Sequence, residues 1–253
     1  MQAARRPREK SKLSRIGRFV VAHVVQSQGK GDFRILLIGC AENEGTIGMM
    51  IEELGPRVAS VWNHLRSTTR NMVERAWKSS AGGSVMQAPR SAPYDPRADH
   101  ELSQLLAALD EHATESGLPA GDDRQSREAR RLADACASVL TQQTQSAEVF
   151  AQLIERAHRR NDYARVDTLA GTLAERLAPS EICELARSGY VVVRALAQEA
   201  LTQMPAQLLV ALLRDPVDAM VARQALQRQA TEYASEEAYR ALREFEDFGS
   251  EDF

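Results

Sequence analysis

Two clusters of arginine contain the residues of this chain that are best suited to binding a ligand. A guanidinium group binds carboxylates and phosphates through paired hydrogen bonds, so clustered arginines are typical of a surface that docks an acidic peptide or a phosphate. A structural interpretation is also open, because arginine near the C-terminal end of a helix complements the helix dipole without any ligand. The residues expected to form a partner-binding patch are Arg127, Arg130, Arg131, Arg156, Arg159 and Arg160.

Groups able to catalyse a reaction or hold a metal are scattered along the sequence. None of the five histidines forms a His-x-x-x-His pair, and His100 and His112 would lie about 18 Å apart on a helix. Cys136 and Cys183 fall on the apolar faces of predicted helices, which is typical of buried, unreactive thiols. The sequence therefore predicts no catalytic residue, no metal site and no cofactor site, and we expect a protein that is not an enzyme.

The most enzyme-like segment is residues 35–45, with the sequence ILLIGCAENEG. A buried strand followed by a glycine-containing loop resembles the way methyltransferases and dinucleotide-binding folds present backbone groups to a cofactor. Only Gly39 and Gly45 are in place, however, and the following residues lack the alternating strands and helices of a parallel sheet. A small cofactor- or nucleotide-binding enzyme, with a ligand site around residues 33–54 and a helical cap, is therefore the alternative function.

Length and composition set the class of protein. The chain has 253 residues, of which 43% are apolar and 26% are charged, and this is enough to bury a core. The composition excludes a wholly disordered chain, a collagen-like repeat and a disulfide-stapled miniprotein. No apolar run has the length of a transmembrane helix, and the three widely spaced cysteines fit a reducing compartment. We expect a cytoplasmic protein without a signal peptide.

Charge is distributed unevenly along the sequence. Residues 1–100 carry 16 lysines and arginines against 9 acidic residues, whereas residues 101–253 carry 16 against 26. A basic segment gains by displacing counterions from phosphates, so residues 1–34 are compatible with binding to nucleic acid or to an anionic surface. The acidic second part disfavours that function for the whole chain, and we expect a protein partner that the sequence does not identify.

The first part of the chain is poorly defined by its sequence pattern. Residues 1–78 form a basic region that contains two short apolar runs compatible with β-strands, Phe19–Val25 and Phe33–Gly39. An amphipathic helix should follow from an N-cap at Thr46. Gly55-Pro56 should break or kink this helix before the helical spacing of apolar residues resumes.

The second part of the chain is predicted to be helical. Residues 79–98 are rich in Gly, Ser and Pro and predict a flexible linker. Residues 99–248 follow as a helical domain in which Ser126 and Ser146 are candidate N-caps, and residues 249–253 form an acidic tail. Because the apolar spacing in this domain is that of helices, we predict a mostly all-α fold.

The later helices repeat. Seven small or apolar positions recur 27 residues later and again, in part, a further 29 residues along. Such a period, with two helices per unit, is typical of a helical solenoid in which each pair of helices packs on its neighbours. An irregular helical array is the alternative. The three sets are Val166, Leu169, Ala170, Leu177, Ile182, Leu185 and Ala186; Val193, Leu196, Ala197, Met204, Leu209, Leu212 and Leu213; and Ala222, Ala225, Leu226, Tyr233, Ala238, Ala241 and Leu242.

One of these units resembles a HEAT repeat. Residues 208–226 combine a leucine-rich first helix, an Asp-Pro turn and a second helix with an apolar–Arg–x–Ala pattern. Val193–Leu201 resembles the second helix of the preceding unit, whose turn lacks the Asp-Pro pair, and the resemblance extends over about residues 162–248. It implies a short HEAT-like α-solenoid that acts as a non-enzymatic protein–protein interaction module or scaffold. The residues that it implies tie neighbouring units together are Arg194, Asp215 and Arg223.

Overall fold

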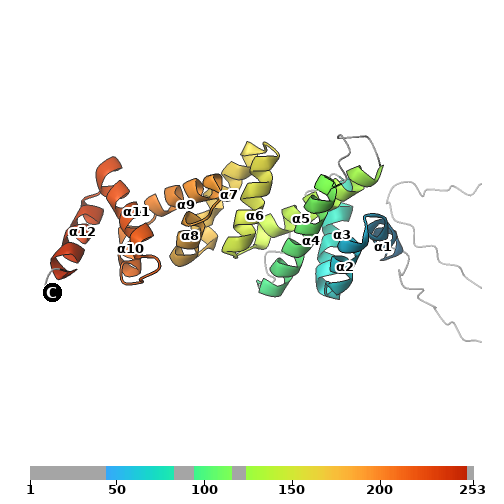
Figure 1. The fold of residues 1–253 in the computed structure, drawn as a ribbon, viewed down its shortest axis with the longest axis horizontal. Coiled ribbons are helices and arrows are strands. Elements are labelled where there is room, and N and C mark those ends of the chain that lie inside the picture. The colour runs from blue at the N-terminus through green and yellow to red at the C-terminus, as the bar shows by residue number, and fades with distance from the viewer. Residues whose placement is uncertain (1–43, 83–93, 116–123, 250–253) are drawn as a thin grey trace, which may run out of the picture. The chain divides into compact units, whose positions relative to one another are not determined.

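The computed structural model describes residues 44–82, 94–115 and 124–249, which form helices and the turns between them, without a β-strand (Figure 1). The all-α prediction is confirmed for these residues. In chain order the helices are α1 (Glu44–Glu53), α2 (Pro56–His64), α3 (Ser67–Gly82), α4 (Pro96–Glu115), α5 (Arg124–Gln143), α6 (Ala147–Arg159), α7 (Tyr163–Arg176), α8 (Pro179–Ala186), α9 (Val191–Thr202), α10 (Ala206–Leu212), α11 (Ala219–Glu232) and α12 (Glu236–Gly249).

Several sequence predictions concern residues outside these ranges. They are the two candidate strands, Phe19–Val25 and Phe33–Gly39, the basic residues 1–34, and all but the first residue of the tail 249–253. These stay predictions. Of the region 33–54 expected to hold a ligand in the alternative function, the structure describes only the part from Glu44 onward.

Helix α1 fills part of the core. It begins at Glu44, so Thr46 lies inside the first turn and is not the N-cap that the sequence predicted. The predicted break is confirmed: Gly55 has a φ of 98°, a conformation that favours glycine, and Pro56 opens α2 with its φ already helical. The buried apolar residues of this helix and its end are Ile47, Met50, Ile51 and Leu54.

Helices α2 and α3 pack against α4 and α5. Arg66, in the turn between α2 and α3, donates from Nε to Oε1 of Glu101 on α4 at 2.7 Å. The hydroxyl of Thr69 on α3 donates to the same carboxylate. The guanidinium of Arg131 on α5 lies over the ring of Trp77 on α3, 4.9 Å from its centroid. These polar contacts supplement the apolar packing between the first three helices and the next two.

The helix boundaries differ from those expected for a linker and a separate domain. Helix α3 extends to Gly82 and α4 begins at Pro96, so both ends of the predicted linker 79–98 are helical. Proline is compatible with a helix start, because the first turn needs no backbone N–H from it. Helices α2 and α3 pack on α4 and α5. The division of the chain into residues 1–78, 79–98 and 99–248 stays a prediction.

Helices α4, α5 and α6 bury the apolar faces that their spacing predicts. Helix α5 begins at Arg124, so the expected N-cap Ser126 lies within it. Ser146 is confirmed as the N-cap of α6, and its side chain accepts a hydrogen bond from the backbone N–H of Val149. The helix ends before Asn161, whose φ of 57° is the left-handed conformation common at helix ends. The buried residues include Leu102, Leu105, Leu106, Leu109, Leu132, Ala133, Cys136, Leu140, Phe150, Leu153 and Ile154.

Helices α7 to α12 are spaced regularly along the chain. Helices α7, α9 and α11 begin at Tyr163, Val191 and Ala219, 28 residues apart in each case. The positions predicted to recur are buried or half-buried, with the exception of Tyr233, which is exposed. The hydroxyl of Tyr233 donates to Oε1 of Glu199 at 3.2 Å, a polar partner that the aliphatic residues at the equivalent positions do not need.

Packing in this part follows the order of the chain. Helix α7 contacts α9 and α9 contacts α11, while α8 and α10 pack beside them. The buried side chain of Gln229 on α11 donates to the carbonyl oxygens of Thr202, at 2.9 Å, and Met204, at 2.6 Å. Arg176 on α7 donates to the carbonyl oxygen of Thr141 near the end of α5 at 2.6 Å. These bonds use carbonyl groups near helix C-termini, the last four of which have no partner within their own helix.

Candidate interaction surface

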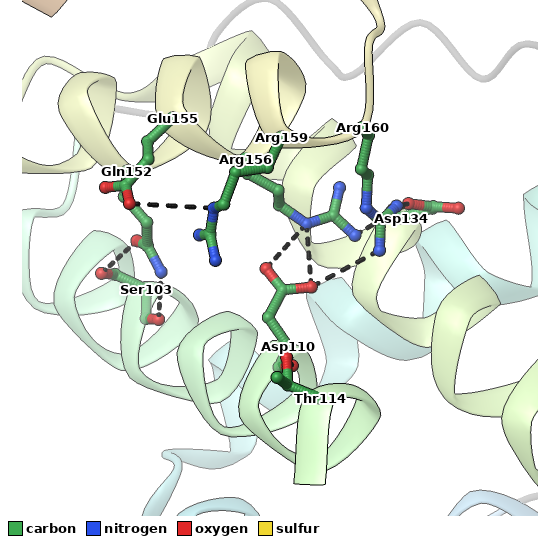
Figure 2. Close-up of polar contacts among 9 residues, drawn as sticks. All are labelled: Ser103, Asp110, Thr114, Asp134, Gln152, Glu155, Arg156, Arg159 and Arg160. Carbon is green, nitrogen blue, oxygen red and sulfur yellow. Dashed lines mark hydrogen bonds and ion pairs between the residues drawn. The ribbon is translucent and has the colours of Figure 1, made fainter. Parts of the chain in front are cut away.

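Arg156 lies at the centre of a charge network that joins α4, α5 and α6 (Figure 2). Its Nε donates to both carboxylate oxygens of Asp110 on α4, at 2.9 and 3.2 Å, and its Nη2 donates to Oδ1 of Asp134 on α5 at 2.9 Å. Arg160 contacts the same carboxylates, at 2.7 Å for Asp134 and 3.4 Å for Asp110. The Arg156 side chain is only 4% exposed, and the two carboxylates supply the counter-charges that a buried guanidinium requires.

The burial of Arg156 follows from its position on α6. It comes three residues after the buried Leu153 and therefore projects from the apolar side of the helix. Arg156 is consequently not part of an exposed docking patch, contrary to the sequence-based prediction. Its guanidinium is a structural link between three helices, and the signal for this in the sequence was its place within the apolar spacing of α6.

The remaining arginines of the expected patch have different surroundings. Arg131 packs on Trp77, and Arg160 shares the carboxylates of the network, so both hold helices together. Arg159 is exposed and pairs with Glu155 one turn earlier, at 3.7 Å. The two other arginines, Arg127 and Arg130, are exposed on α5.

The residues expected to tie repeat units together make mostly local contacts. Asp215 accepts a hydrogen bond from the backbone N–H two residues later, at 2.8 Å, and so stabilises its own turn. Arg194 donates to the carbonyl oxygen of Ser188, in the turn that precedes its own helix, at 2.9 Å. Within the part of the chain that the structure describes, Arg223 alone of the three reaches a different helix, with its guanidinium 5.2 Å from the ring centroid of Phe245 on α12.

Two contacts that the sequence did not predict connect successive turns. Nη1 of Arg187, just after α8, donates to Oδ1 of Asp218 at 2.6 Å and to the carbonyl oxygen of Val217 at 3.3 Å. Nδ1 of His158, near the end of α6, lies 2.8 Å from the hydroxyl of Tyr190, and the two rings meet edge to face. Side-chain contacts thus link the turn before α7 to the turn before α9, and the turn before α9 to the turn before α11.

We call the surface along these turns the turn edge and define it by residues 158–163, 187–191 and 214–220. Tyr163 and Val191 are the first residues of α7 and α9, and Met220 is the second residue of α11. These positions are therefore comparable in the three turns. Large apolar side chains gathered on a surface are typical of sites where another protein binds. Four of them are between 57% and 71% exposed, namely Tyr163, Val191, Val217 and Met220.

Comparison with known proteins assigns the chain to no family. No family model, no curated protein and no solved structure matches it. The resemblance to HEAT repeats therefore rests on the residues and on the spacing of the helices. Within residues 44–82, 94–115 and 124–249, no helix is long and apolar enough to cross a membrane, and no group of His, Cys, Asp and Glu side chains is arranged to hold a metal ion.

One buried acid, Asp99, lies in the first turn of α4. The hydroxyl of Tyr94 donates to its Oδ2 at 3.0 Å. Burial raises the pKa of Asp99 above its ordinary value, and burial together with the adjacent carboxylate raises the pKa of Tyr94 to about 12. Tyr94 precedes α4 and Asp99 lies within it, so the pair anchors the start of this helix, and we assign it a structural role.

Two cysteines are buried in the helices. Burial raises the pKa of Cys136 on α5 to about 12 and that of Cys183 on α8 to about 11. Because the thiolate is the reactive form of cysteine, both side chains stay protonated and unreactive at neutral pH. The prediction that these two residues are buried apolar groups is confirmed, and the third cysteine, Cys40, lies outside the described residues.

Proposed function

We propose that this chain is a protein–protein interaction module and not an enzyme, and that a short HEAT-like solenoid presents the turn edge to its partner. The observation that carries the proposal is the row of exposed apolar side chains at comparable positions in three successive turns. Buried apolar anchors supply most of the binding energy at typical protein interfaces. Side chains of this kind on linked turns are placed to act as such anchors.

The solenoid part of the proposal is supported by the order of packing. Helices α7, α9 and α11 begin at equal intervals, and each contacts the next. The ion pair between Arg187 and Asp218 and the hydrogen bonds of Gln229 also join neighbouring pairs of helices. In a helical solenoid each unit packs on its neighbours, and contacts between distant units are few.

Two exposed arginines of the turn edge favour a partner with acidic residues beside its apolar anchors. Arg214 is exposed and makes no ion pair with another described residue. Arg159 has only the long, exposed pair with Glu155, which contributes little stability and leaves the guanidinium available. A helical or extended segment that combines apolar and acidic side chains fits both features.

A triple variant tests this function. Photo-crosslinking from position 191 in cells identifies the partner, and calorimetry with the purified partner then measures its affinity for Y163S/V191S/M220S. Loss of several anchors should weaken binding by about tenfold or more. The control is L208S/V210S, which removes two exposed apolar side chains of α10 outside the turn edge and should leave the affinity unchanged. Equal affinities of the triple variant and the parent would reject the turn edge as the binding surface.

The alternative function, a cofactor- or nucleotide-binding enzyme with a site around residues 33–54, stays a prediction. The part of this region in α1 places Ile47, Met50 and Ile51 in the core, where they serve packing. Thermal melting in the presence of nucleotides or S-adenosylmethionine tests the remainder, because a ligand that binds only the folded protein raises its melting temperature. Such a rise would favour the enzyme over the interaction module.

A further inference from the structure

The last described helix, α12, has two contrasting faces. Ala238, Leu242 and Phe245 pack toward the core, against α10 and α11. The opposite face lines an open groove of about 690 Å³ beside the end of α11. The exposed residues of this second face, which we call the end face, are Glu236, Tyr239, Arg240, Arg243 and Glu244, and the groove is completed by Ala230, Ala234 and Ser235.

The end face has no partner within the described residues. Helix α12 contacts α10 and α11, and no other described helix packs as extensively on it. The charged side chains of the end face form no ion pair with other described residues, although Glu236 and Arg240 are spaced for one within the helix. Tyr239, in the middle of the face, is 59% exposed. Unpaired charges of both signs therefore surround an exposed aromatic ring on this face of α12.

We propose that the end face binds the end face of a second copy of this chain, with the two α12 helices antiparallel about a two-fold axis. The order of residues along α12 makes this face complementary to itself. An axis midway between positions 239 and 240 brings Glu236 opposite Arg243 of the second copy. It also brings Tyr239 opposite Arg240 of the second copy, which is a favourable pair of a ring and a guanidinium. Two-fold symmetry makes each contact twice.

Helix geometry supports this register. Positions 236 and 243 are seven residues apart, close to two full turns, so both side chains project from the same side of α12. A parallel pairing would place like charges opposite each other, whereas the antiparallel pairing places Glu opposite Arg at both ends. The neighbouring residues Ala230, Ala234 and Ser235 are small and leave room for the second helix to approach.

Charge-reversal variants of the full-length chain test the proposal by sedimentation velocity over a wide range of protein concentration. The parent should be a reversible dimer. E236R and R243E each place like charges opposite one another twice in the pair and should raise the dissociation constant by about tenfold or more. An equimolar mixture of the two single variants should restore dimers, because Glu and Arg again face each other. The double variant E236R/R243E should dimerise as the parent does.

Two controls separate this contact from other effects. E175R reverses a charge at an exposed position of α7, outside the end face, and should leave the dimer unchanged. Thermal melts should show that all variants fold. A parent that is monomeric at every concentration would overturn the proposal and leave the groove to a different protein. Mixed E236R and R243E proteins that remain monomeric would also overturn it. If Y163S/V191S/M220S forms dimers with the same dissociation constant as the parent, the end face acts independently of the turn edge.

Discussion

Replacing Arg156 with methionine tests whether its guanidinium holds α4, α5 and α6 together. The variant R156M keeps a long side chain in the same space and removes the charge. Asp110 then loses the hydrogen bonds of 2.9 and 3.2 Å and keeps only the 3.4 Å contact with Arg160. Asp134 keeps its 2.7 Å contact with Arg160. We expect a folded protein with a lower free energy of unfolding.

The burial of the two acids sets the size of this effect. Removing one member of a buried ion pair lowers the free energy of unfolding by about 3–5 kcal/mol. The side chain of Asp110 is 17% exposed and that of Asp134 is 52% exposed, so water and Arg160 compensate part of the loss. The lower end of the range, about 3 kcal/mol, is therefore expected, and it corresponds to a fall in melting temperature of about 6–12 °C for a unit of this size.

Urea unfolding followed by circular dichroism measures the difference. The control R159A removes an exposed arginine from the same helix, with only its 3.7 Å pair to Glu155, and should change the free energy by less than about 0.5 kcal/mol. The double variant R156M/D110L removes both charges and should regain part of the stability, since no buried acid is left without its partner. An R156M protein that unfolds within about 1 kcal/mol of the parent would refute the reasoning.

Two further predictions concern buried acids. Because burial raises the pKa of Asp99 in the folded protein, its ionisation opposes folding. The stability of the parent relative to D99N should therefore fall as the pH rises from the ordinary pKa of 3.8 to the raised pKa of the folded protein. A difference in unfolding free energy between the two proteins that does not vary with pH would contradict this. D218A removes the acceptor of the 2.6 Å hydrogen bond from Arg187 and should lower the free energy of unfolding by about 1–3 kcal/mol. The exposed-site variant R214A is its control, and thermal melts in which the two variants are equally stable would show that the ion pair does not hold the turns together.

The buried faces of the helices were predictable from sequence because they depend on local spacing. Leucines three and four residues apart on α4 share one side of the helix, and this does not depend on how the rest of the chain packs. Ser146 was also predictable, since a hydroxyl before an apolar run suits a helix start. Thr46 and Ser126 show the limit of that rule. A hydroxyl residue is tolerated inside a helix, so its presence does not establish where the helix begins.

The charge contacts were not predictable in the same way. Asp110 and Asp134 are 46 and 22 residues from Arg156, and Asp218 is 31 residues from Arg187. No local pattern relates such positions, and only the packing of the helices brings them together. An arginine within the apolar spacing of α6 was the one local indication of a buried guanidinium. The exposed apolar row of the turn edge depends likewise on how successive turns are linked.

The two buried thiols have a consequence for how the array unfolds. Cys136 lies on α5 and Cys183 on α8, and each becomes reactive only when its own helix leaves the core. In a C40S background, brief exposure to a thiol reagent followed by mass analysis records the opening of each helix separately. Equal labelling rates at the two cysteines would indicate one cooperative unit. Faster labelling of one cysteine would show which of the two helices, α5 or α8, unfolds first.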